Sequence, residues 1–155
     1  MERPWVREKT KNSSKTIIAW LSIGSTYTYL TALRLEEIKK SENLALIIKP
    51  FSIRSIMKTQ GNILFPPKKQ KTKYMWRDIE RRAQKYSLPV PGTPVPYPLQ
   101  NFDLANKVGL VANNQGWYLE YLREAYKVWF LEGKEAGSEQ NLKNTLQNLS
   151  KNFYE

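Results

Sequence analysis

The stretch TIIAWL at residues 16–21 is a run of β-branched and apolar residues, and it predicts a buried strand. Turn and helix-capping residue types follow at 22–26 (SIGST), and helix-compatible sequence extends over about 27–40. A second apolar run, LALII at 44–48, is stopped by Pro50. Two continuous apolar runs around one helix are typical of a parallel βαβ unit whose strands are buried on both faces. The sequence therefore predicts an α/β fold that opens with a βαβ unit.

Beyond Pro50 the sequence becomes mostly helical. Within residues 68–86, Met75, Ile79 and Ala83 recur at helical spacing. The stretch 88–98 contains five prolines, which exclude a helix or a central strand there. Further helices are expected over residues 101–113, 116–132 and from 138 onward.

This pattern divides the chain into three parts. Residues 1–14 are expected to be a disordered basic arm, residues 15–50 the βαβ unit, and residues 51–155 an all-helical domain. Two strands make a small sheet with two open edges, because stable sheets normally have three or more strands or a covering layer. Either a partner supplies further strands, or the chain stops before its own.

The composition excludes several classes of chemistry. The 155 residues contain no cysteine and no histidine. Disulfides, thiolate nucleophiles, Cys/His metal sites and imidazole catalysis are therefore absent, and no metal site is expected. Chemistry must use hydroxyls, carboxylates, amines and amides, or a group brought by a cofactor.

No targeting segment is evident in the sequence. The apolar run at residues 17–23 is interrupted by Ser22 and is short for a secretory signal. No stretch approaches the roughly 20 apolar residues of a membrane span. A cytoplasmic protein without a membrane partner is the expectation.

Three motifs together resemble a known family. They are SIGSTYTYL at 22–30, KPFSIRSIMKTQGN at 49–62 and KTKYMWRDIERRAQKYSLP at 71–89. In order and spacing they resemble 2-hydroxychromene-2-carboxylate isomerases and the related kappa-class glutathione transferases, over roughly residues 16–149. The resemblance implies a DsbA-like thioredoxin fold with a helical domain inserted after the first βαβ unit. It also implies that this chain lacks the C-terminal thioredoxin half.

The resemblance carries four functional residues onto this sequence. The family's catalytic serine falls on Ser25, and its glutathione-contacting asparagine falls on Asn62. The family's lysine falls on Lys71, and the aspartate that reaches the neighbouring subunit's glutathione falls on Asp78. Two departures occur in the first motif: Thr26 stands where the family has proline, and Ser22 where it has aspartate. The implied cofactor is glutathione, the implied partners are a small aromatic substrate and a second copy of the chain, and the implied activity is isomerisation by reversible thiolate addition.

Each of these residues also has a structural interpretation. Ser25 can be a helix N-cap, and Asn62 an ordinary turn residue after Gly61. Lys71 can be a solvated charge, and Asp78 can pair with an arginine at 81 or 82 along its helix. The aromatic residues of 117–130 can line a substrate pocket, although a stripe at helical spacing favours core.

Three other functions stay open. The chain can be a kappa-class transferase or a non-catalytic thioredoxin-like protein. It can also bind nucleic acid, because 25 Lys and Arg against 14 Asp and Glu give a net charge of +11. The basic residues are scattered over residues 9–15, 68–73 and 77–85 without a nucleic-acid module, so nucleic acid is the weaker alternative. Disulfide oxidoreductase activity, known in the same superfamily, is excluded by the absence of cysteine.

Overall fold

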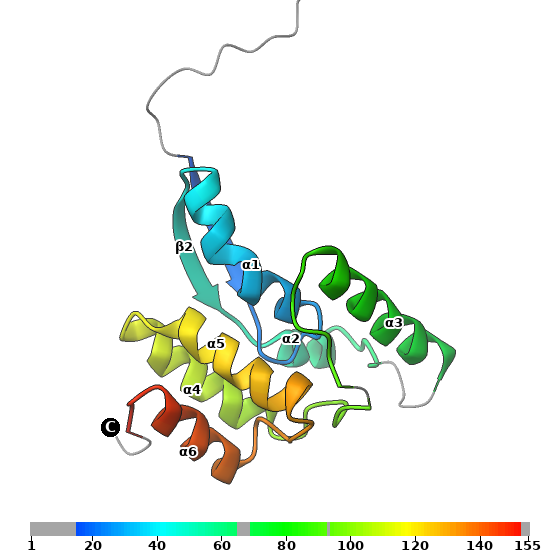
Figure 1. The fold of residues 1–155 in the computed structure, drawn as a ribbon. Helices are drawn as coiled ribbons and strands as arrows, with labels where there is room; N and C mark the ends of the chain where they lie inside the picture. The colour runs from blue at the N-terminus through cyan, green and yellow to red at the C-terminus, as the bar shows by residue number, and fades with distance from the viewer. Residues whose placement is uncertain (1–14, 65–68, 93, 153–155) are drawn as a thin grey trace, which may run out of the picture.

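A computed structural model describes residues 15–64, 69–92 and 94–152 of the chain. The elements follow one another as β1 (Thr16–Leu21), α1 (Thr28–Ser41), β2 (Ala45–Pro50), α2 (Ile53–Thr59), α3 (Gln70–Lys85), α4 (Phe102–Asn114), α5 (Tyr118–Tyr126), η1 (Lys127–Leu131) and α6 (Glu139–Asn148). Figure 1 shows α1 alongside the strand pair, α4, α5 and α6 grouped at one end of it, and α3 standing to the side. The arm expected at residues 1–14 lies outside the described residues.

The predicted βαβ unit is confirmed. β1 and β2 pair in parallel, in a register that runs from Thr16 opposite Ala45 to Leu21 opposite Pro50. The expectation that both strands are buried on both faces is wrong for the described chain, since Ile18 is 51% exposed and Trp20 59% exposed. The described sheet has two strands, and α4 and α5 pack against β2. These helices do not cover the whole sheet, since apolar side chains of both strands remain exposed.

The helical part follows the expected order, with one addition and one refinement. α2 was not expected, because its 7 residues are too few to show a helical period; Ser52 caps it by accepting a hydrogen bond from the Ser55 amide at 3.3 Å. The helix expected over 116–132 is divided into α5 and the π-helical η1. Ser138 caps α6, as its residue type favours.

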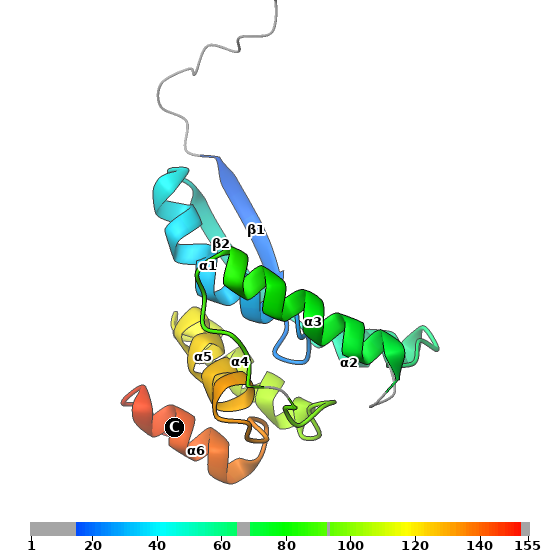
Figure 2. The same ribbon diagram turned by 45° about the vertical axis from the view of Figure 1, so that its right-hand side comes forward.

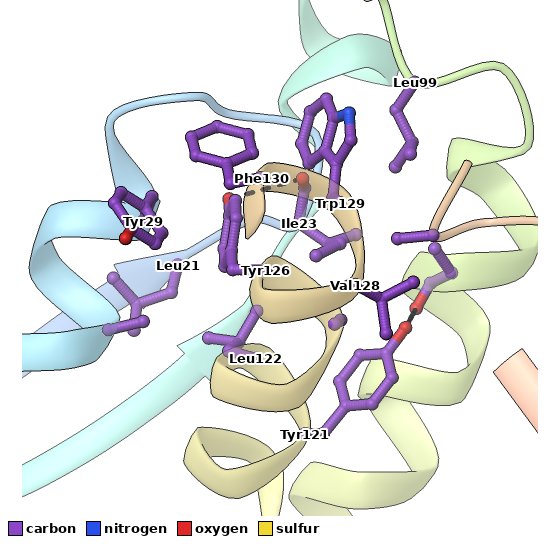
Figure 3. Close-up of a cluster of buried hydrophobic side chains, with 14 of the residues drawn as sticks. Leu21, Ile23, Tyr29, Leu99, Tyr121, Leu122, Tyr126, Val128, Trp129 and Phe130 are labelled. Carbon is purple, nitrogen blue, oxygen red and sulfur yellow. Dashed lines mark hydrogen bonds between the residues drawn. The ribbon is translucent and has the colours of Figure 1, made fainter. Parts of the chain in front are cut away.

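One aromatic cluster joins the two parts of the chain. The rings of Tyr29, Tyr126, Trp129 and Phe130 gather beside Ile23 (Figure 3), and all are fully or almost fully buried. The Trp129 indole donates a hydrogen bond to the Pro96 carbonyl at 2.5 Å, and the Tyr29 hydroxyl donates one to Pro89. These aromatic residues are therefore core, and they also fasten the proline-rich connector. The βαβ unit and the helices share one core, while the division at residue 50 stays a prediction.

Two tyrosines of α5 support the turn between β1 and α1. Tyr118 donates from its hydroxyl to the Leu21 carbonyl at 2.9 Å. The Tyr126 hydroxyl lies within hydrogen-bond distance of three carbonyls, at 2.5 Å from Ser25, 3.1 Å from Ser22 and 3.3 Å from Ile23, and its one proton is shared among them. The turn that carries Ser25 is thus fixed by buried side chains of a helix about a hundred residues further along the chain.

Burial of these tyrosines predicts a loss of stability in alkali. Desolvation raises the pKa of Tyr29 to about 12, and it raises the pKa of Tyr118, Tyr121 and Tyr126 above the ordinary 10.0. The folded state therefore holds these protons more tightly than the unfolded chain does. Their contribution is complete below about pH 10 and is lost as the pH rises toward 12 and beyond. We expect Tm to fall steeply above about pH 10.

Tyrosinate absorbance and circular dichroism, followed together from neutral to strongly alkaline pH, measure this effect. The buried tyrosines should ionise only as the ellipticity is lost. Ionisation of every tyrosine near pH 10.0, the value for an unperturbed phenol, with full retention of the fold would contradict this account.

Candidate functional site

A small apolar pocket opens beside the β1–α1 turn. Its volume is about 200 Å³, and Ser25 is one of its lining residues. The other walls come from the turn itself, from α2 and the segment after it, from α3 and from the proline-rich connector. The lining residues are Gly24, Ser25, Thr26, Tyr27, Ile53, Met57, Ile63, Leu64, Met75 and Tyr97. Four segments that are distant in the sequence therefore converge on Ser25.

Ser25 is not the N-cap of α1. The helix begins at Thr28, and the residue in the N-cap position, Tyr27, makes no side-chain capping bond. The Ser25 amide donates to the Ser22 carbonyl at 3.1 Å, and the Ser25 carbonyl accepts from the Thr28 amide at 3.2 Å. Within the described part of the chain, the Ser25 hydroxyl has no hydrogen-bond partner. The simple structural interpretation of this serine is therefore wrong, and its hydroxyl is available to a ligand.

The turn offers two further donors. The amides of Thr26 and Tyr27 donate no hydrogen bond to any described residue. Thr26 is only 7% exposed, and its hydroxyl donates to the Met75 sulfur at 3.2 Å. Unpaired amides at the start of a helix favour a negative charge. The serine hydroxyl and the two amides together suit an anionic ligand atom.

Ser22 has a structural role next to this turn. It is completely buried, and its hydroxyl accepts a hydrogen bond from the Ile53 amide at 3.2 Å. This contact ties the end of β1 to the first residue of α2. A serine therefore fixes the relative position of two of the walls of the pocket.

Lys71 lies in an adjoining pocket. That pocket has a volume of about 470 Å³ and is lined by Tyr27, Gln70, Lys71, Tyr74 and Met75. Tyr27 and Met75 belong to both pockets, so they form the wall between the Ser25 side and the Lys71 side. Ser25 and Lys71 therefore line two neighbouring pockets that share a wall.

Asp78 is bound to the pocket wall and to its own helix. Its carboxylate accepts hydrogen bonds from the Tyr27 hydroxyl at 2.8 Å and from Arg82 Nε at 2.9 Å. Of the two arginines considered from the sequence, Arg82 is the partner. These bonds lower the pKa of Asp78, and burial together with the carboxylate raises the pKa of Tyr27 to about 12. Tyr27 is therefore protonated at neutral pH and oriented by Asp78.

Asn62 is not among the residues lining either pocket. Its side chain is exposed and donates to the Gln60 amide oxygen at 3.3 Å, while its backbone amide donates to the Met57 carbonyl at 2.8 Å. The next two residues, Ile63 and Leu64, do line the Ser25 pocket. The structure places Asn62 beside the pocket, in the turn that ends α2, with its side chain engaged outside it.

Three residues of the site were not selected from the sequence. Tyr27 lies inside the first motif but carried no assigned role, and Tyr97 lies in the proline-rich connector, where no pattern points to a pocket. Arg54 lies directly behind the Ser25 turn. It is the one charged residue in the stretch 51–57, FSIRSIM, and this was a signal in the sequence.

The order of the elements and the turn before α1 define a thioredoxin-like protein. The family model of the DSBA-like thioredoxin domain matches residues 16–151, and the chain belongs to this family. Among solved structures, the chain is similar to a 2-hydroxychromene-2-carboxylate isomerase, with a TM-score of 0.68 and 18% sequence identity. The match covers 88% of this chain and 66% of the isomerase chain. No curated protein matches by sequence. In the part of the chain that the structure describes, no helix is long and apolar enough to cross a membrane.

Proposed function

We propose that the chain binds glutathione at the Ser25 pocket and acts as a glutathione-dependent isomerase of the 2-hydroxychromene-2-carboxylate type. One observation carries the proposal: Ser25 lines an apolar pocket, its hydroxyl has no partner among the described residues, and two amides next to it are unpaired there. A thiolate needs such donors, because hydrogen bonds to the charged form favour it over the thiol. The choice of glutathione rests on the resemblance of the three sequence motifs to glutathione-dependent isomerases, and the similarity to the solved isomerase supports a shared fold.

Different residues of the site bind different parts of the ligand in this proposal. Ser25 and the amides of Thr26 and Tyr27 receive the sulfur, and Lys71 receives a carboxylate from the adjoining pocket. The apolar walls around Met57 and Met75 accept an aromatic substrate and exclude water. When bound, glutathione supplies a thiolate that adds reversibly to an unsaturated substrate and is regenerated. The enzyme's task is to stabilise the charge and to position the two molecules.

Asp78 and Asn62 have narrower roles in this proposal. Asp78 orients Tyr27 at the wall between the two pockets, because its carboxylate accepts a hydrogen bond from the Tyr27 hydroxyl. Asn62 stabilises the turn that places Ile63 and Leu64 in the wall. A second copy of the chain and a cytoplasmic location belong to the proposal as well. An assay of 2-hydroxychromene-2-carboxylate with and without glutathione tests the activity; conversion that needs both enzyme and glutathione is expected, and conversion at equal rate without glutathione would contradict it.

Replacing Lys71 by methionine tests the contact with the ligand's carboxylate. We expect glutathione affinity to fall about threefold to tenfold at low ionic strength, because one charge-assisted contact is lost, and the deficit to shrink in high salt. Lys73→Met is the matched control, since Lys73 is exposed on the same helix and does not line the pocket. Isothermal titration calorimetry measures both variants. Equal losses in the two would show a general effect of charge and remove Lys71 from the site.

A kappa-class transferase is the neighbouring candidate, since it needs the same thiolate site. The narrow apolar pocket, about 200 Å³, favours a small substrate that is bound, turned and released. Product analysis separates the two functions: a transferase forms a stable glutathione conjugate, whereas an isomerase leaves the glutathione concentration unchanged.

A further inference from the structure

Arg54 is a buried cation that the proposed binding of glutathione does not use. Its side chain, on α2, is only 7% exposed, and it is the one charged residue among the buried residues that the structure describes. Its Nε and Nη2 atoms are completely buried and have no hydrogen-bond partner in the described chain. These two atoms form one edge of the guanidinium group. Because a buried unpaired charge is costly, a negative charge bound nearby would stabilise it.

The guanidinium lies directly behind the turn that carries Ser25. A Cβ atom added to Gly24 would lie 3.2 Å from Arg54 Cγ and 3.5 Å from Nε, so the side chain packs against the backbone of this turn. Ile53, next to Arg54 in the sequence, and Tyr97, which interacts with it electrostatically, both line the Ser25 pocket. Gly24 lines the Ser25 pocket and also packs against Arg54, so the positive charge lies close to the pocket.

Glu135 is the opposing charge. One carboxylate oxygen accepts hydrogen bonds from the amides of Gln100 and Asn101 at 3.0 and 3.2 Å, just before α4. The other oxygen is buried without a partner in the described chain, and Glu135 interacts electrostatically with Arg54. The two side chains form no ion pair within 4.0 Å in the described structure, and Arg54 lies 5.4 Å from the Phe102 ring instead. Arg54 is therefore only partly compensated.

We propose that Arg54, from behind Gly24, supplies the positive charge that favours the ionised form of a thiol bound at Ser25, and that Glu135 limits this effect. The inference rests on the proposed function. In a partly dry interior, a unit charge acts on another over several ångströms with far more energy than in water. Arg54 does not touch the sulfur, so it tunes and positions rather than takes part in the reaction.

Four other titratable groups of the described residues lie at or near the pocket. Tyr27 is protonated and bound to Asp78, and the Asp78 carboxylate is paired with Arg82. Lys71 lies on the far side of the Tyr27 wall, in the adjoining pocket. Tyr97, on the near side, has a raised pKa because of burial, and it is neutral at physiological pH. Arg54 and Glu135 take no part in the Tyr27–Asp78 and Asp78–Arg82 contacts. Neutralising either of them therefore changes the charge near the bound thiol and leaves those contacts in place.

The experiment measures the pKa of the bound thiol. Glutathione and S-methylglutathione, which cannot ionise at sulfur, are titrated calorimetrically into the full chain between mildly acidic and alkaline pH. The difference between the two ligands in protons released gives the ionisation of the thiol. The proteins compared are wild type, Arg54→Met, Arg54→Lys and Glu135→Gln; lysine keeps the charge, and glutamine keeps an oxygen for the Gln100 and Asn101 amides.

The charges predict shifts of opposite sign. Arg54→Met should raise the pKa of the bound thiol by about one unit, Arg54→Lys should leave it within a few tenths, and Glu135→Gln should lower it. S-methylglutathione should bind the four proteins with similar affinity. A merely structural role of the pair would change Tm without these opposed shifts.

The possible results distinguish failure of the Arg54 inference from failure of the proposed function. If wild type binds glutathione but Arg54→Met leaves the thiol pKa unchanged, or both charge changes move it in the same direction, the inference is overturned and the proposed function stands. If wild type binds neither ligand, the proposed function fails and the inference fails with it. Should Arg54→Met not fold, Glu135→Gln decides alone: a thiol pKa that does not fall overturns the role of the pair.

Discussion

Replacing Ser25 by alanine is expected to lower the glutathione-dependent turnover about 100-fold, the usual effect of removing one donor to a developing or bound anion. Ser25 directly precedes the unpaired amides of the turn, and its hydroxyl has no structural bond to lose in the described chain. The fold should therefore be unaffected, and Tm should change by less than about 2 °C, as for a residue without a packing or hydrogen-bonding role. Steady-state turnover and thermal unfolding of the same preparation measure both effects.

Ser41→Ala is the matched control. Ser41 lies at the other end of α1, where its hydroxyl donates to the Ile38 carbonyl at 3.3 Å. This variant should keep full turnover. Retention of wild-type turnover by Ser25→Ala would remove the serine from the reaction, and a large fall in Tm would show that the hydroxyl is structural after all.

Replacing Tyr126 by phenylalanine is expected to cause the largest loss of stability from removing a single oxygen atom. Its hydroxyl lies against the carbonyls of Ser22, Ile23 and Ser25, and the side chain is completely buried. Phenylalanine keeps the ring contacts but removes a buried hydroxyl donor from this turn, which costs about 1–3 kcal/mol. The Ser22 and Ser25 carbonyls keep only their bonds from the Ser25 and Thr28 amides. In a chain of this size Tm should fall by about 2–4 °C for each kcal/mol. Thermal unfolding by circular dichroism measures the change.

The same substitution should weaken the proposed ligand site, because it frees the turn that carries Ser25. Tyr74→Phe is the control for Tm alone, since Tyr74 is 72% exposed and its hydroxyl can be solvated by water, whereas its place in the Lys71 pocket excludes it as a control for affinity. An unchanged Tm for Tyr126→Phe would contradict the view that α5 fixes the turn. A lower Tm with unchanged glutathione affinity would show that the turn keeps its shape without this support.

The order of the elements could be predicted because local patterns specify it. The runs at 16–21 and 44–48, the stripe through Met75 and the proline-rich stretch each depend on neighbouring residues alone. The exposure of Trp20 could not be predicted in this way. An apolar run shows that a strand has side chains suited to burial. How many of them are covered depends on the packing of distant elements, which the run itself does not specify.

The candidate site was predicted at the level of the motif and not of the contacts. The motif containing Ser25 does line a pocket, and Lys71 lies in the adjoining one. The bond between Tyr27 and Asp78 spans 51 residues, and Arg54 and Glu135 are 81 positions apart. Such pairings arise from packing of distant elements, and no spacing rule within one helix or strand reports them.

The most direct test of glutathione binding is thermal unfolding of the chain with and without millimolar glutathione, with Ser25→Ala measured alongside. A ligand that binds only the folded state raises the free energy of unfolding by about 2.7 kcal/mol at a hundred times its Kd. We expect one cooperative transition that moves upward with glutathione in wild type and less in Ser25→Ala. A cooperative transition that glutathione does not move at any concentration would contradict the proposed site.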